Sequence, residues 1–297
     1  MPMRRALALL VFVLPLAACG GNGGVFHASG SAPSLAEAAT KSASASTLKM
    51  NLSMTMTSPS LPKAIMMTAT GSEDNVRHRA DIQLDMSSLA SSLGANAPQQ
   101  FADPSLWKGE EIADFSRGHF VVYMHLPLLT NLIPGHKPWV KLDLAVYGKR
   151  LGIDFSQLTQ FSSNPGQTLD WLRSTNGAVT HVGTQTIGGV QTTHYKAAID
   201  LSKYPNMVPA GRRAAVRKAI NAVINLTGLR TFPVDVWISD DGLVRQMNMS
   251  FTEDVSGQQL TIYMATRFHD FNKPVRITLP PASETLDSTQ FVGASGP

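Results

Sequence analysis

The chain has 297 residues, of which 43% are hydrophobic and 15% charged, and its formal net charge is +4. This composition allows a substantial core and excludes an intrinsically disordered chain, and the small charge excess argues against a nucleic-acid partner. After residue 18, no apolar run reaches the length of about 20 residues that a membrane-spanning helix needs.

The first residues have the pattern of an export signal. Arg4 and Arg5 precede an apolar run from Ala6 to Leu16 that is interrupted only by Pro15. This run has the length of a signal peptide and is too short for a transmembrane helix. Leu16-Ala17-Ala18-Cys19 follows and resembles the bacterial lipobox, in which small residues precede a cysteine that is acylated before cleavage. The alternative is a small buried cysteine behind an ordinary leader.

We therefore predict a signal peptide over residues 1–18 and a lipid anchor on Cys19, the only cysteine of the chain. Acyl chains such as palmitate would hold the mature protein on the extracytoplasmic side of the cell membrane. Residues 19–33 are predicted to be the acylated cysteine and a Gly- and Ser-rich tether. Residues 34–281 would form the folded domain, and residues 282–297 a polar C-terminal tail.

The domain is expected to begin with a helix from Ser34 to about Ser46, because Ser34 and Glu37 can form a capping box. From Leu48 to Met56, apolar and polar residues alternate, which predicts a half-buried strand. Further strands are predicted at 65–70, 76–86, 119–126, 139–144, 178–187, 191–201, 234–238, 243–251 and 260–268.

The segments between these strands are of three kinds. Residues 87–105 are interpreted as a surface excursion, residues 145–175 have a helical pattern, and a second long helix is expected over about 209–226. Gly188-Gly189 and Asp240-Asp241-Gly242 predict turns. The sum is an α+β fold: a strongly curved antiparallel half-barrel sheet of about ten strands, with helices packed on its concave apolar face.

Several stretches of the chain resemble the LppX/LprG-type bacterial lipoproteins, which have a LolA-like fold. They are the hairpins His181 to Tyr195 and Pro233 to Arg245, the strand Lys137 to Asp143, and the closing segment Phe268 to Ile277 followed by Pro280. The resemblance implies a half-barrel closed by helices around a lipid cavity. It also implies a membrane lipid or glycolipid as ligand and an envelope transporter of unknown identity as a further partner.

Methionines dominate the apolar faces of the predicted strands. Thioether side chains suit the soft, adaptable wall of a lipid cavity, although they also fill ordinary cores. Combined with the resemblance, this pattern identifies the candidate cavity wall as Met50, Met54, Met56, Val122, Met124, Met247, Met249, Phe251, Ile262 and Met264.

Four cations, Arg212, Arg213, Arg217 and Lys218, gather at the start of the second helix. They are candidates for contact with lipid headgroups or a membrane surface, and the alternative is a solvated polar face. The histidines are scattered without metal-ligand spacing, and no nucleophile elbow or phosphate-binding loop is present, so we expect no metal and no cofactor. Two acidic pairs, Glu110-Glu111 and Asp240-Asp241, are interpreted as surface and turn residues.

The leading functional hypothesis is a non-enzymatic, membrane-anchored lipoprotein that binds lipid acyl chains in a hydrophobic cavity and carries or delivers them in the cell envelope. Two alternatives stay open. One is a structural or signalling lipoprotein whose core is filled by its own side chains. The other is an envelope hydrolase with dispersed catalytic residues.

Overall fold

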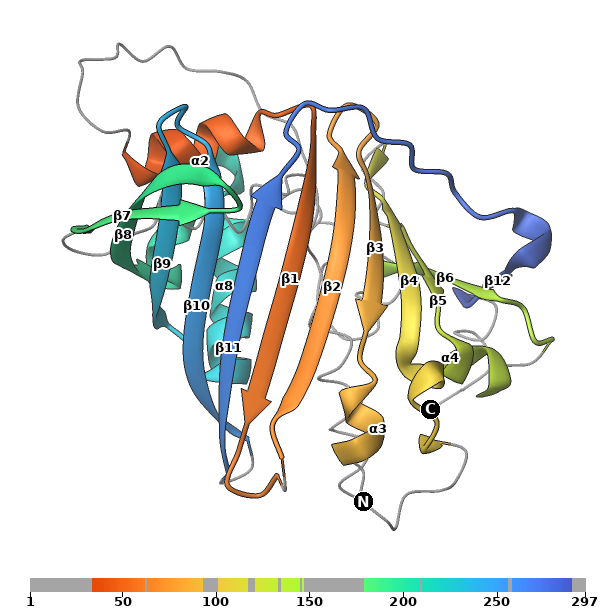
Figure 1. The fold of residues 1–297 in the computed structure, drawn as a ribbon. Coiled ribbons are helices and arrows are strands. Elements are labelled where there is room, and N and C mark those ends of the chain that lie inside the picture. Colours follow the sequence, from red (N-terminus) through yellow and green to blue (C-terminus); the bar gives the residue numbers. More distant parts are fainter. Residues whose placement is uncertain are drawn as a thin grey trace.

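The computed structural model describes residues 34–61, 63–92, 101–116, 121–132, 135–144, 146, 179–208, 210–255 and 258–289. Within these residues, one twelve-stranded sheet dominates the molecule, and a few helices accompany it (Figure 1). Its strands are β1 (Thr47–Thr57), β2 (Ile65–Asp74), β3 (Arg79–Asp85), β4 (Lys108–Asp114), β5 (Val121–His125), β6 (Trp139–Asp143), β7 (Thr180–Ile187), β8 (Val190–Asp200), β9 (Thr231–Ser239), β10 (Val244–Val255), β11 (Gln258–His269) and β12 (Thr285–Asp287).

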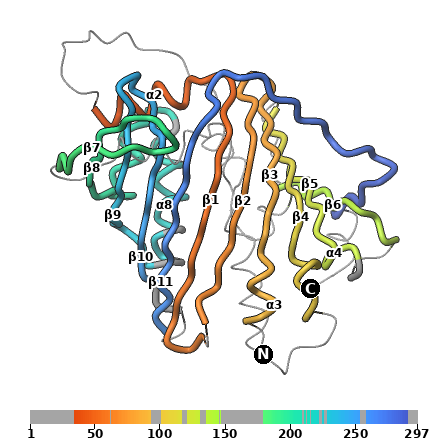
Figure 2. The backbone as a smooth tube through the Cα atoms, in the orientation of Figure 1, coloured from red at the N-terminus to blue at the C-terminus, as the bar shows by residue number. Residues whose placement is uncertain are grey.

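The sheet has the order β12-β6-β5-β4-β3-β2-β1-β11-β10-β9-β8-β7. Two meanders therefore lie side by side, joined where β1 pairs antiparallel with β11, as the backbone trace also shows (Figure 2). The exception to antiparallel pairing is β12, which lies parallel to β6 with Thr285 opposite Trp139. Residues 285–287, which fall within the expected C-terminal tail, thus add a strand to one edge of the sheet.

Two features of the predicted fold need correction. The sheet has twelve strands, not about ten, because β4 and β12 were not predicted. It is also open and uncurled, with β12 at one edge and β7 at the other, so the expected strongly curved half-barrel with helices on a concave face is not confirmed. The sequence did not predict β4, because the charged residues Lys108, Glu110 and Glu111 interrupt the alternation of apolar and polar residues that identifies a strand.

The helices are α2 (Leu35–Ala43), α3 (Ser88–Ser92), α4 (Pro127–Leu132) and α8 (Arg213–Thr227), and the 3-10 turns are η2 (Pro104–Trp107), η5 (Leu201–Asn206), η6 (Ala210–Arg212) and η7 (Ala282–Glu284). Helix α8 lies behind β10 and β11, and α2 crosses the ends of β9 and β10 (Figure 1). Together they cover one half of the sheet, while α3 and α4 lie beside the other half.

The predicted capping box at the start of α2 is confirmed. The Ser34 backbone N–H donates to Glu37 Oε2 at 2.8 Å, and the Glu37 N–H donates to Ser34 Oγ at 3.2 Å. The helix then buries Leu35, Ala38 and Ala39 in the main core. A local sequence signal therefore determines where the helix starts, and its apolar side determines where it packs.

The tight β7–β8 connection also follows from local sequence. Gly188 and Gly189 have φ angles of 57° and 81°, a left-handed conformation that residues with a side chain rarely adopt. The predicted hairpin is confirmed, with Ile187 paired to Val190.

Candidate functional site

A row of methionines crosses the middle of the sheet. Met249 on β10 pairs with Met264 on β11, Met264 pairs with Met54 on β1, and Met54 pairs with Met67 on β2. We call these four residues the methionine row, and the side of the sheet that carries it the inner face. Met54 and Met249 are 3% exposed and Met67 is 4% exposed, whereas Met264 is only partly buried.

A second row runs beside the first. Phe251 pairs with Ile262, Ile262 with Met56, and Met56 with Ile65. Directly opposed side chains in an antiparallel pair share one face of the sheet. The second row therefore continues the apolar surface toward the β1–β2 turn.

The strand register places all ten predicted wall residues on the inner face. They are Met50, Met54, Met56, Val122, Met124, Met247, Met249, Phe251, Ile262 and Met264. They belong to three packed clusters, one of which, around Val122, is separate from the methionine row. Met264 packs against three clusters and thereby links the two halves of the face.

Sequence reasoning missed one member of the methionine row. Met67 alternates with exposed residues in β2, between the buried Ile65 and Ala69. The same period of two that identified Met54 and Met56 was present here and was a sufficient signal.

Two buried carboxyl groups share the inner face with the methionines. Glu73 on β2 lies between Leu48 and Ala80 and is 0% exposed, and none of the described residues forms a hydrogen bond with either of its carboxyl oxygens. Burial raises the pKa of Glu73 well above its usual range, and the neighbouring Asp74 charge adds to this effect. Burial thus favours the protonated, uncharged form of this carboxyl.

Glu111 is the second carboxyl, and its burial corrects the interpretation of Glu110-Glu111 as a surface pair. It lies on β4 between Ile82 and Met124 and is 5% exposed. Burial raises the pKa of Glu111 to about 8. The inner face thus combines an apolar region with two buried carboxyl groups, which can donate hydrogen bonds when protonated.

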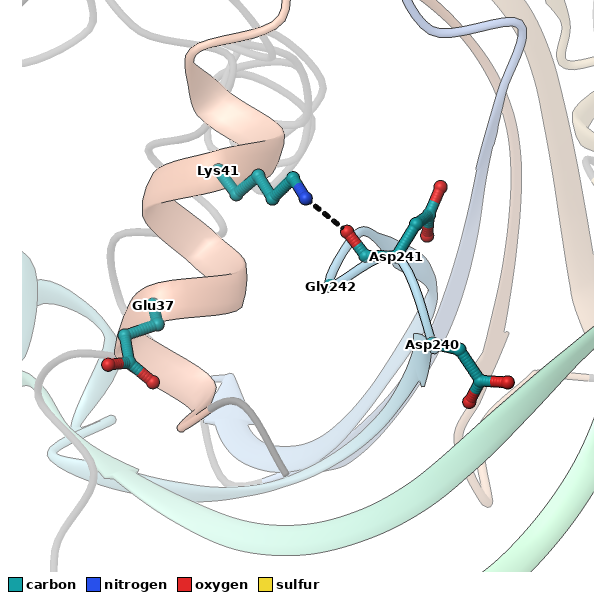
Figure 3. A pocket seen from close by; sticks show the side chains of 5 residues that line it. All are labelled: Glu37, Lys41, Asp240, Asp241 and Gly242. Carbon is teal, nitrogen blue, oxygen red and sulfur yellow. Dashed lines mark hydrogen bonds between the residues drawn. The ribbon is translucent and has the colours of Figure 1, made fainter. Parts of the chain in front are cut away.

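The acidic pair Asp240-Asp241 is at the turn where the sequence predicted it. It borders a polar hollow of about 250 Å³ that Glu37, Lys41 and Gly242 also line (Figure 3). Lys41 Nζ donates to the Asp241 carbonyl oxygen at 2.5 Å across this hollow. A second polar hollow, of about 230 Å³, includes Met50, and no other predicted wall residue lines either hollow.

The outer face carries an aromatic and polar cluster on β7, β8 and β9. His194 stacks on Trp237 with ring centroids 4.2 Å apart, and His194 Nε2 lies 2.6 Å from Asp235 Oδ1. Trp237 Nε1 donates to Gln185 Oε1 at 2.9 Å. These contacts connect β7, β8 and β9 at the edge of the sheet. Within the described part of the chain, no hydroxyl or thiol is hydrogen-bonded to His194, as a nucleophile–base pair would require.

The four predicted cations lie where η6 passes into α8. The side chains of Arg213, Arg217 and Lys218 are exposed, and Arg212 ends η6. One of them, Arg213, is tied to the preceding loop, because its Nε donates to the Val208 carbonyl oxygen at 3.2 Å.

Cys19, the leader, the tether and the helical pattern expected over 145–175 lie outside the described residues, apart from residue 146. In the regions that the structure describes, no group of three or more His, Cys, Asp or Glu residues is arranged to hold a metal ion. In the same regions, no helix has the length and hydropathy that a membrane span requires.

Comparison with known proteins identifies one weak sequence relative and several structures of similar architecture. No family model matches the chain. An uncharacterised 31.2 kDa protein of Streptomyces griseus, from the rplA–rplJ intergenic region, is 26% identical over 168 residues. That alignment spans 54% of this chain and about half, 52%, of the relative.

Among solved structures, LprF of Mycobacterium bovis has 13% identity and a TM-score of 0.38, with 83% of this chain and 94% of LprF covered. The lipoprotein LppX of Mycobacterium tuberculosis has 12% identity and a TM-score of 0.42, with coverage of 82% and 94%. The LppX-type lipoproteins that the sequence resembles are thus among the structural neighbours. A LolA superfamily protein of Nitrosomonas europaea follows at 7% identity and a TM-score of 0.27, over 82% of this chain and 93% of that protein. Identities this low transfer no ligand and no residue role to the present chain.

Proposed function

We propose that this chain is an exported, acylated lipoprotein that binds the acyl chains of a membrane lipid or glycolipid on the inner face and delivers them within the cell envelope. The methionine row carries this proposal. Four flexible thioether side chains opposed across four neighbouring strands form a surface that can repack around chains of different length.

The binding mechanism we propose is transfer of apolar surface from water and bilayer into the protein. Each Å² of acyl chain that the inner face covers contributes about 25 cal/mol, which offsets the cost of leaving the membrane. Glu73 and Glu111 fit the polar end of such a ligand. Both groups are buried, and burial favours their protonated form, so they offer hydrogen-bond donors to a hydroxyl or ester oxygen in an otherwise apolar setting.

One observation favours a second candidate function, a structural lipoprotein with a filled core. Met50, Met54 and Met249 are each 3% exposed, and the two polar hollows do not reach the methionine row. If the chain's own side chains fill all the space beside the inner face, the methionines pack a core and bind no ligand.

Native mass spectrometry of the mature chain from its own host distinguishes these candidates. A carrier retains a lipid, and after delipidation it binds a fluorescent fatty acid with saturation and gains thermal stability by mass action. Met54→Trp and Met249→Trp then weaken uptake by filling volume, while the exposed Ser53→Trp serves as the matched control. A chain that retains no lipid and takes up none before or after delipidation contradicts the proposal and supports the filled core.

A further inference from the structure

Positive charge is concentrated in one segment of the molecule. Residues 201–234, which include η5, η6 and α8, contain no Asp or Glu, and their six cations are Lys203, Arg212, Arg213, Arg217, Lys218 and Arg230. Since the whole chain carries +4, all the rest of it has a net charge of −2. The nearly balanced composition therefore conceals a basic region on an otherwise acidic protein, and such a region attracts anionic surfaces.

Helix α8 turns two different sides to its surroundings. Val216 is 1% exposed and packs against Tyr204, and Ile220 packs against the main core. Arg213 and Arg217, one turn apart, are exposed, as is the adjacent Lys218. The buried side fixes the helix on the protein, so its cations are held in a constant position facing solvent.

An exposed apolar side chain lies in the loop that Arg213 contacts. Met207 is 46% exposed, in the loop between η5 and η6. Arg213 donates from Nε to the Val208 carbonyl oxygen at 3.2 Å and from a terminal nitrogen to the Asn206 carbonyl oxygen at 3.4 Å. The two acceptors flank Met207 in sequence, so the guanidinium group ties the loop and its methionine to the first turn of α8.

We propose that Met207 and the exposed cations Arg213, Arg217 and Lys218 form a docking surface for an anionic lipid bilayer. The cations match lipid phosphates, and Met207 reaches the boundary between headgroups and acyl chains, the combination by which peripheral proteins hold an anionic membrane. A nucleic acid or an anionic polysaccharide would engage the charges but leave Met207 in water, so a bilayer fits the surface better. This inference does not depend on lipid uptake by the inner face.

Site-specific fluorescence on the full mature chain tests the docking surface. Met207→Cys is labelled with an environment-sensitive thiol probe, and Val76→Cys, at a position 71% exposed on the β2–β3 turn, is labelled as the matched control. The wild-type chain, whose sole cysteine is Cys19, gives the labelling background. Each protein is reconstituted into phosphatidylcholine vesicles with and without phosphatidylglycerol, so that any membrane anchor is present in both samples.

Docking predicts a blue shift of the probe at position 207 in the anionic vesicles only, reversed by high salt, and no shift at position 76. Arg217→Ala with Lys218→Ala, which removes two exposed charges, should lower the ratio of docked to undocked protein by roughly 30-fold at about fivefold per charge, without lowering the melting temperature. Equal spectra at position 207 in both vesicles, or equal shifts at positions 207 and 76, would overturn the proposal. A shift produced by soluble polyanions but not by anionic vesicles would overturn it as well.

Discussion

Replacing Glu111 by glutamine gives a direct test of the buried carboxyl on the inner face. The substitution keeps the shape and hydrogen-bonding capacity of the side chain but removes its titration. Glu111 is 5% exposed between Ile82 and Met124, and its burial raises its pKa from 4.5 to about 8. In the wild type, deprotonation therefore leaves a charge that burial has removed from water.

The sign and size of the effect follow from proton linkage. Between pH 4.5 and 8 the folded state keeps the Glu111 proton while the unfolded chain releases it, so wild-type stability falls as pH rises through this window. Each pH unit corresponds to about 1.4 kcal/mol. Relative to wild type, Glu111→Gln should gain about 1 kcal/mol in unfolding free energy at pH 5 and about 5 kcal/mol at pH 9.

Urea unfolding at pH 5, 7 and 9, followed by circular dichroism, measures this difference, and constant slopes confirm that the same transition is compared. Glu110→Gln is the control, because Glu110 is only partly buried and points to the outer face opposite Gln83 and His125. Its effect should stay within about 0.5 kcal/mol of wild type at every pH. A difference between Glu111→Gln and wild type that is the same at pH 5 and pH 9 would refute the reasoning.

Three further outcomes are expected. Cys19→Ala should abolish acylation and processing by the lipoprotein pathway, so recovery of a mature, acylated, membrane-bound variant would exclude the lipobox. Met54→Asp places an unpaired charge in the methionine row and should destabilise the domain by about 3 kcal/mol or more in urea unfolding, whereas Ser53→Asp on the outer face should be tolerated. Gly109→Ala should destabilise the folded domain by about 1–3 kcal/mol, because its Cβ would lie 2.4 Å from the His125 carbonyl oxygen. Gly211→Ala is the control and should not destabilise the domain, because the space around Gly211 is open. Equal melting temperatures of the two variants would contradict this close approach of β4 and β5.

Sequence reasoning succeeded where structure depends on neighbouring residues. The capping box of α2, the alternation in β1 and the glycine turn between β7 and β8 are all local signals, and each element formed where it was predicted. Because alternate side chains of a strand point to opposite faces, period two alone placed the ten wall residues on one side of their strands. Whether that side binds a lipid stays a prediction.

The tertiary structure decided what depends on pairing between distant segments. Strand β12 exists because residues 285–287 lie along β6, and nothing in three residues predicts a partner so far away in the chain. The alignment of Met249, Met264, Met54 and Met67 into one row is a matter of register, which alternation within a strand does not specify. Glu111 shows most clearly what a sequence does not determine by itself. A glutamate side chain favours water, and only the packing of β4 between β3 and β5 buries this one and holds its proton near neutral pH.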